Sequence, residues 1–184
     1  MRALAVLLVA IGGPAAACPT ADDLAGGIRA VHANGDVSVH ARDGEGRIVL
    51  RGTFFGDAYV ETTLDGLNPI LLAFAGEGPT VTEYDDPPPP PGVDGAVTGR
   101  DLEAGAVYPV SLRHDWSDPE PWTAGGCTYD SVPGVRLRLE ADGAVGERDL
   151  LRWLPDLGIV LVEGWDVEND PEGRVPVERI EAVR

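Results

Sequence analysis

The chain has 184 residues, with 14 basic and 31 acidic side chains and a formal net charge of −17 at pH 7. Every basic residue is an arginine, which excludes chemistry that requires lysine, such as a Schiff base. The negative charge argues against nucleic acid and anionic lipid headgroups as partners, because both would be repelled.

The first 17 residues are typical of an export signal. Met1-Arg2 is a short positive start, residues 3–11 are apolar, and Ala15-Ala16-Ala17 provides the small residues that a signal peptidase needs. The apolar run is shorter than the ~20 residues that cross a bilayer. We therefore expect cleavage before Cys18, no membrane span, and a periplasmic or secreted protein. Residues 18–184 then carry a charge of −18, since only Arg2 is lost, and are enough for one domain.

The chain has two cysteines, Cys18 and Cys127. In an oxidising compartment we expect them to form a disulfide. Closing a loop of roughly 110 residues stabilises a fold by about 4 to 5 kcal/mol in the chain-entropy model. The alternative is an inner- or outer-membrane lipoprotein, acylated at Cys18 with Cys127 free. Lipoprotein signals usually have leucine where this chain has Ala15, which favours the disulfide.

The first half of the domain predicts one short helix followed by strands. Thr20-Ala21-Asp22-Asp23, followed by Leu24, Ile28 and Val31, predicts a capped helix that Asn34-Gly35 ends. Residues 36–42 alternate apolar and polar side chains, the pattern of a half-buried strand. Turns that contain glycine separate three more predicted strands, at 47–55, 58–64 and 67–75.

A run of five prolines, Pro87–Pro91, interrupts the strands. Such a run favours polyproline II and donates no ladder hydrogen bonds, so residues 86–92 are expected to be a stiff surface connection that tolerates shortening. A predicted loop covers 114–126. Further strands are predicted at 106–113, 127–132, 135–141, 144–154, 157–165 and 174–183. The fold class is therefore mostly β: an antiparallel meander that forms a curved sheet or a (half-)barrel with one short N-terminal helix.

The predicted loop at 114–126 holds the densest group of catalytic residue types, His114, Ser117 and Asp118. Nucleophile and base rarely converge from such close neighbours in a loop, and no G-x-S-x-G elbow surrounds any serine. We therefore predict no catalytic residue. A small periplasmic hydrolase that uses the His114–Asp130 region stays as an alternative.

Metal and cofactor sites are not predicted. His32, His40 and His114 have neither i,i+4 nor C-x-x-C companions, which disfavours zinc. The acidic residues of Asp166–Glu172 alternate as in a calcium loop, but Pro171 stands where an EF-hand needs glycine. Calcium at that segment is left open.

The chain has four tryptophans. Trp116 and Trp122 lie in the predicted loop and are candidates for a ligand wall, while Trp153 and Trp165 lie in predicted strands and are candidates for the core. The leading hypothesis is thus an exported, non-enzymatic binding or structural module of the cell envelope. Its partner is a small or apolar ligand or another envelope protein.

The late segment Trp153-Leu154-Pro155-Asp156-Leu157-Gly158-Ile159-Val160-Leu161, with the closing strand at 174–183, resembles a hairpin of the LolA/LolB-like lipoprotein carriers. In those periplasmic half-barrel proteins an aromatic residue, a proline and a Leu-Gly pair mark the bend between two late strands. The resemblance implies an unclosed antiparallel barrel that holds acyl chains over a helical lid. Residues 22–31 are the segment that would form the lid, and the resemblance assigns no binding residue.

Overall fold

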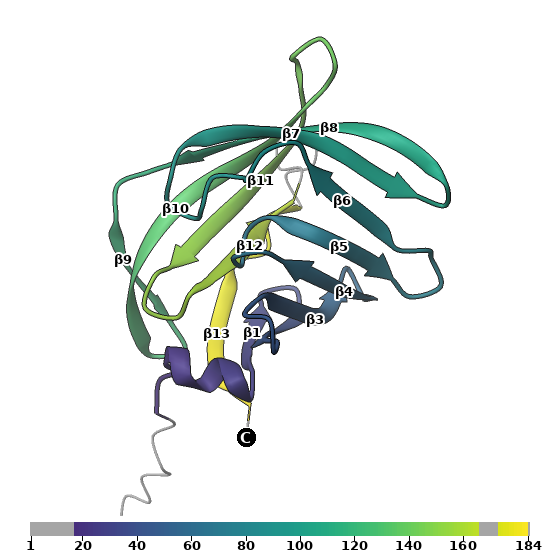
Figure 1. Cartoon of the computed structure of the whole chain (residues 1–184). Coiled ribbons are helices and arrows are strands. Elements are labelled where there is room, and N and C mark those ends of the chain that lie inside the picture. The colour runs from purple at the N-terminus through teal and green to yellow at the C-terminus, as the bar shows by residue number, and fades with distance from the viewer. Residues whose placement is uncertain (1–16, 166–172, 184) are drawn as a thin grey trace, which may run out of the picture.

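The structure, a computed structural model, describes residues 17–165 and 173–183. Apart from Ala17, the predicted export signal lies outside the described residues, as does Asp166–Glu172. One antiparallel sheet curls around an interior, with the short helix η1 at one end (Figure 1). The first elements are η1 (Ala21–Ala25), β1 (Ile28–His32), β2 (Val37–Arg42), β3 (Ile48–Phe54), β4 (Asp57–Thr63), β5 (Pro69–Phe74) and β6 (Thr80–Tyr84). They are followed by β7 (Gly95–Glu103), β8 (Ala106–Trp116), β9 (Glu120–Ala124), β10 (Cys127–Leu139), β11 (Val145–Leu154), β12 (Ile159–Gly164) and β13 (Val177–Ala182).

The strands pair almost entirely in chain order, and the last strand, β13, returns to pair with β1. β9 continues the path of β8 and pairs with the first half of β10. The seam of the barrel lies between β12 and β13. There the N–H of Val175 donates to the carbonyl of Glu163 and that of Trp165 to Gly173, both at 2.9 Å. The expected antiparallel meander is confirmed, and the sheet is nearly closed into a barrel.

The expected helix over 20–31 is wrong beyond its first turn. η1 is a five-residue 3₁₀ helix, with the Asp23 carboxylate accepting from the Thr20 N–H at 2.8 Å. It ends at Gly26-Gly27, where Gly27 adopts a φ of +116° that other residues rarely reach. Residues 28–32 instead form β1, which pairs with β2 and β13 on its two sides. Of the apolar residues that resembled a helix face, Leu24 is buried in η1, Ile28 is on the buried face of β1, and Val31 is on the opposite, half-buried face.

The second half contains strands that the sequence pattern did not predict. β6 and β7 flank the proline run, and β9 lies inside the predicted loop at 114–126. Pro133-Gly134, expected to be a turn, continues β10. Gly134 is required there because the Trp116 ring lies against its backbone, so that a Cβ at this position would collide with the ring.

Gly134→Ala should lower the free energy of unfolding by about 1 to 3 kcal/mol, because the added methyl group displaces the half-buried Trp116 ring from its packing. Urea denaturation measures the change. Gly78→Ala is the matched control, since nothing lies within 4 Å of a Cβ at that turn. Equal stability of the two variants would contradict the packing of Trp116 on Gly134.

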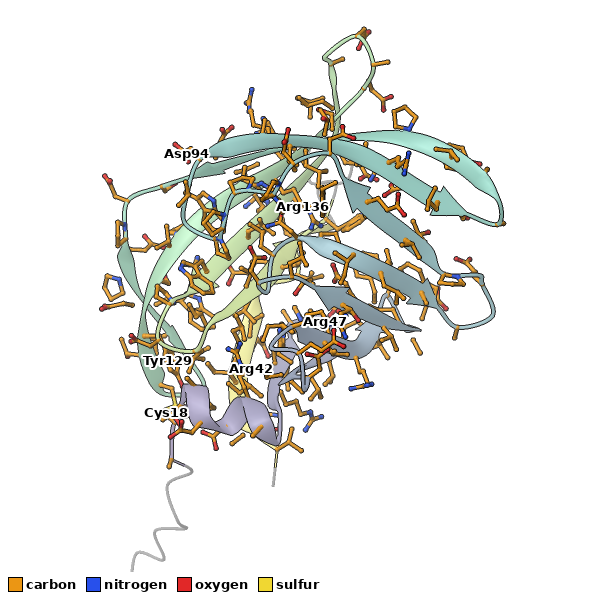
Figure 2. All side chains as sticks on the ribbon, in the orientation of Figure 1. Cys18, Arg42, Arg47, Asp94, Tyr129 and Arg136 are labelled. Carbon is orange, nitrogen blue, oxygen red and sulfur yellow. A yellow bond between two sulfur atoms is a disulfide. The ribbon has the colours of Figure 1, made fainter. Side chains whose placement is uncertain are left out.

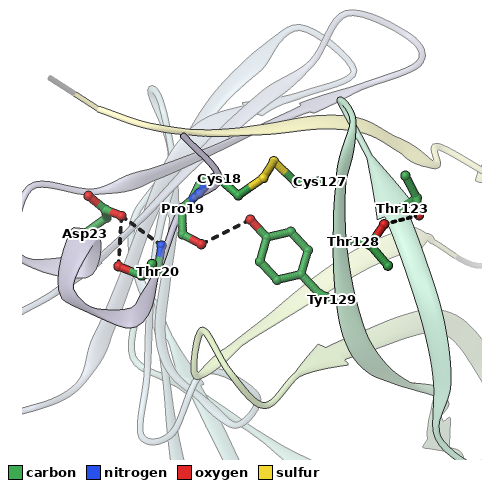
Figure 3. The surroundings of a disulfide bond; sticks show 8 residues. All are labelled: Cys18, Pro19, Thr20, Asp23, Thr123, Cys127, Thr128 and Tyr129. Atoms are coloured by element: carbon green, nitrogen blue, oxygen red, sulfur yellow. Dashed lines mark hydrogen bonds between the residues drawn. A yellow bond between two sulfur atoms is a disulfide. The ribbon is translucent and has the colours of Figure 1, made fainter. Parts of the chain in front are cut away.

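The interior near η1 is filled by a large apolar cluster. It is formed by Leu24, Ile28, Ala30, Ile48, Leu50, Cys127, Tyr129, Leu154, Leu157, Ile159, Leu161, Val177 and Ile180. The predicted disulfide between Cys18 and Cys127 is present and joins the segment before η1 to the start of β10 (Figure 3). Beside it, the Tyr129 hydroxyl donates to the carbonyl of Pro19 at 3.1 Å. η1 therefore plugs this end of the barrel.

The hairpin of β11 and β12 is buried on both faces. Leu154 and Leu161 belong to the large cluster, whereas Leu151 and Val160 pack with Leu67 in a second cluster on the other side. The apolar run 159–162, and the apolar residues on both sides of Arg152 in 150–154, thus reflect two-sided burial. None of the described segments forms a helix that is long and apolar enough to cross a membrane.

The proline segment connects β6 to β7 and contacts the second cluster. The Pro89 carbonyl accepts from the Asn68 amide at 3.0 Å, and Gly92 lies against the Trp153 ring. Pro87 and Pro90 are exposed, while the other three prolines are half-buried. That the segment tolerates shortening stays a prediction.

Candidate functional site

A cavity of about 150 Å³ lies inside the barrel. Phe54 and Phe74 end β3 and β5, Thr80 begins β6 and Trp165 follows β12, and all four line it. Because alternate strands run in opposite directions from η1, these positions share the end of the barrel away from η1. The aromatic and aliphatic part of the wall consists of Phe54, Tyr59, Pro69, Leu72, Phe74, Tyr84, Val110, Leu112, Val162 and Trp165.

Aromatic rings gather at this end. Phe54 contacts Trp165 edge to face at 5.5 Å between ring centroids, and Tyr59 lies 6.0 Å from Phe74. Phe55, which is 53 % exposed, packs on Phe54 at 4.7 Å. We call Phe54, Tyr59, Phe74 and Trp165 the aromatic mouth. Phe54 and Phe74 end their strands and Trp165 directly follows β12. Tyr59 lies on β4, so the backbone of the sheet positions all four rings.

The rest of the lining consists of two threonines and six charged residues. Arg136 projects from β10 into the space that the sheet encloses (Figure 2). Its Nη2 and Nε both donate to Oδ2 of Asp149 on β11, at 2.8 and 2.9 Å. Arg138 pairs with Asp101 at 2.8 Å, and Thr82 donates to the same carboxylate at 2.7 Å. Each guanidinium group is thus held by a carboxylate from another strand.

Glu61 on β4 differs from these residues. It lines the cavity, and its carboxylate has no hydrogen-bond or ion-pair partner among the described residues. Burial raises the pKa of Glu61; the positive charge of Arg136 opposes this rise, and the negative charge of Asp149 adds to it. The residue is half-buried and is one of those that line the cavity. Glu61 is therefore the carboxyl group available to a bound molecule.

The described lining contains four carboxylates, Glu61, Asp101, Glu147 and Asp149, and two guanidinium groups, Arg136 and Arg138. The two guanidinium groups are paired with Asp149 and Asp101.

A second hollow of about 40 Å³ adjoins the cavity and shares three of its lining residues. Here Ser38 Oγ lies 3.1 Å from His40 Nε2, while His40 Nδ1 has no partner among the described residues. Burial lowers the pKa of His40 to about 4, and His32 adds to the effect. A serine–histidine pair without an acid on the second nitrogen lacks the part of a catalytic triad that orients the base. Ser38 is also only 4 % exposed, so this pair is part of the packing.

The catalytic residue types of 114–118 do not come together. His114 lies on β8 with no exposed surface, and neither ring nitrogen has a partner among the described residues. Asp115 is exposed and pairs with Arg113 at 2.9 Å. Ser117 and Asp118 are also exposed. These residues therefore do not form the catalytic site that the hydrolase alternative would require.

The tryptophans are distributed differently from the expectation. Trp116 packs against the second apolar cluster, and Trp122 against the large one with the Arg152 guanidinium 5.5 Å from its ring centroid. Neither is among the residues that line the cavity, and ligand binding by them stays a prediction. Trp153 packs in the second cluster, whereas Trp165 belongs to the aromatic mouth. Glu61, Arg136 and Arg138 were not predicted as site residues.

Buried histidines should make stability depend on pH. Burial lowers the pKa of His114 to about 4; nearby Arg136 lowers it further and Asp115 opposes this. In the unfolded chain the same histidine binds a proton near pH 6.5. The stability that neutral His114 contributes to the fold is therefore fully present above that pH and is lost as the pH falls toward 4. Between pH 7 and pH 5, one such histidine should remove about 2 kcal/mol of stability.

Urea denaturation of the wild type and of His114→Leu at the two pH values tests this. The loss on going from pH 7 to pH 5 should be about 2 kcal/mol smaller in the variant. An identical loss in both proteins would show that His114 does not remain neutral in the fold.

Among the described residues, no group of three or more histidine, cysteine, aspartate or glutamate side chains is arranged to hold a metal ion. The fold and the cavity define an antiparallel β-barrel with a ligand-sized interior. Comparison with protein-family models, curated proteins and solved structures found no significant match.

Proposed function

We propose that this protein is an exported, non-enzymatic binding protein that holds a small molecule in the cavity at the end of its barrel away from η1. The cavity with its aromatic mouth carries the proposal. A volume of about 150 Å³ is close to that of an engineered apolar protein cavity that binds benzene. The wall combines aromatic rings with a few polar groups, which is the usual composition of a small-molecule site.

Binding rather than catalysis is supported by the state of the polar groups. Arg136 and Arg138 are held in ion pairs. The Ser38–His40 pair lies in the adjoining hollow and is nearly inaccessible. Export is supported by the N-terminal sequence and fits the disulfide, which is a feature of proteins outside the cytoplasm. The sulfur of Cys18 is used in that bond, so a form lipidated at Cys18 could not contain the disulfide.

Benzyl alcohol is a suitable probe, because its ring matches the cavity and it carries no charge. Ligand-observed NMR should detect weak binding to the wild type and loss of at least tenfold in affinity in Leu72→Trp, which fills the cavity. Val107→Trp is the control, since Val107 is 62 % exposed and does not line the cavity. Equal binding to all three proteins would contradict the proposal.

A further inference from the structure

Resting on the proposed binding function, we propose that the ligand is a small organic cation. It is an amine, protonated at neutral pH, with a body about the size of a benzyl group. The cation lies against the Glu61 carboxylate, and the apolar body lies within the aromatic mouth.

Glu61 needs a donor that none of the described residues provides. Its directly paired neighbours across the sheet are Leu50 on β3 and Leu72 on β5, which carry no hydrogen-bond donor in their side chains. The nearest opposing charge that acts on it is Arg136, but that group directs two N–H donors at Asp149. Even a half-buried carboxylate is less stable without a donor than with one, and a bound protonated amine would supply both the donor and the charge.

The charge that faces the cavity points the same way. Glu61 lines the cavity with no ion-pair partner among the described residues, so it attracts a cation and repels an anion. A neutral ligand would leave Glu61 without a counter-charge. Beyond the cavity, the net charge of −17 raises the local concentration of cations and speeds their encounter with the protein.

The aromatic mouth suits the same ligand. The face of an aromatic ring carries negative electrostatic potential, and ammonium groups bind within about 6 Å of ring centroids, with tryptophan the best partner. Trp165 and Tyr59 are half-buried, so each keeps ring surface toward the cavity that it lines. Aromatic rings beside an acid form the arrangement by which proteins hold ammonium ions.

Four probes of matched shape or known chemistry separate the possibilities: benzylamine, benzyl alcohol, benzoate and dodecanoate. Each is titrated into the full-length mature protein at pH 7.5 by calorimetry or ligand-observed NMR. Benzylamine should bind at least tenfold more tightly than benzyl alcohol, and benzoate should bind more weakly than either. Glu61→Gln should reduce benzylamine affinity at least tenfold while changing benzyl alcohol affinity less than twofold. Glu83→Gln is the matched control, because Glu83 is an exposed carboxylate paired with Arg100.

The other outcomes overturn the inference, and they do so in distinguishable ways. Equal affinity for benzylamine and benzyl alcohol, lost in Leu72→Trp, would leave the binding function standing and remove the cation. Dodecanoate as the tightest ligand would favour an acyl-chain carrier. Benzylamine binding unchanged in Glu61→Gln would place the cation elsewhere, and no binding of any probe would remove both proposals. If Glu61→Gln does not fold, the comparison of the probes on the wild type decides.

Discussion

Asp149→Ala should lower the free energy of unfolding by about 3 to 5 kcal/mol, the usual cost of removing one partner of a buried ion pair. The Arg136 and Asp149 side chains are only 12 % and 4 % exposed, with their atoms 2.8 Å apart. In the variant the Arg136 guanidinium would remain in the interior without its main counter-charge. Burial disfavours the charged form of Arg136, while Asp149 and then Glu61 favour it, and the balance raises its pKa. The arginine therefore stays charged, and the cost falls on the fold.

Two controls identify the cause in urea denaturation. Glu83→Ala removes a carboxylate from an exposed pair and should cost less than about 1 kcal/mol. The double replacement Arg136→Met with Asp149→Leu removes both charges and should recover most of the loss, because apolar residues of similar volume often replace such pairs at no cost. A loss of less than about 1 kcal/mol in Asp149→Ala would show that Arg136 reaches water and is not buried.

Replacing both cysteines, Cys18→Ala with Cys127→Ala, should lower the free energy of unfolding by about 4 to 5 kcal/mol. The bond joins positions 109 residues apart, so it removes much conformational freedom from the unfolded chain. It also keeps the segment before η1 at the plugged end, where Leu24 is 1 % exposed in the large cluster.

Reductant provides an internal comparison. Wild-type protein in dithiothreitol should unfold at the same urea concentration as the double variant, and the double variant should not respond to reductant. Intact mass analysis of untreated protein should give the oxidised mass. Two free thiols in that analysis, or a stability change below about 1 kcal/mol on reduction, would contradict a structural role for the bond.

The meander could be predicted from the sequence where local signals are strong. Glycine turns separate alternating segments from 36 to 75, and the structure has strands there. The errors have physical causes. Ile28 and Val31 have helical spacing, but Gly26-Gly27 stops the helix and β13 provides a partner strand from the far end of the chain. In β6 and β7, threonine, glycine and charged residues are mixed with apolar ones. Part of the inward face of these two strands is polar, so the sequence lacks the apolar alternation of a half-buried strand.

The candidate site could not be predicted for the same reason. On β2, Ser38 and His40 are buried, whereas the intervening Val39 is only half-buried. On β10, Arg136 and Arg138 alternate with Leu137, a pattern in which the charged side chains usually point away from the buried face. In the barrel both line the cavity, and Arg138 meets Asp101 from a strand 37 residues earlier. Such pairs depend on register across the sheet, which no local pattern contains.

The four indole N–H signals of the protein test the central claim most directly. In ¹H–¹⁵N spectra recorded during a titration with benzylamine, the Trp165 indole signal should shift in proportion to saturation, because Trp165 is the tryptophan that lines the cavity. The signals of Trp116, Trp122 and Trp153 should stay unchanged. A shift at Trp116 or Trp122 with none at Trp165 would move the binding site out of the barrel and contradict the account.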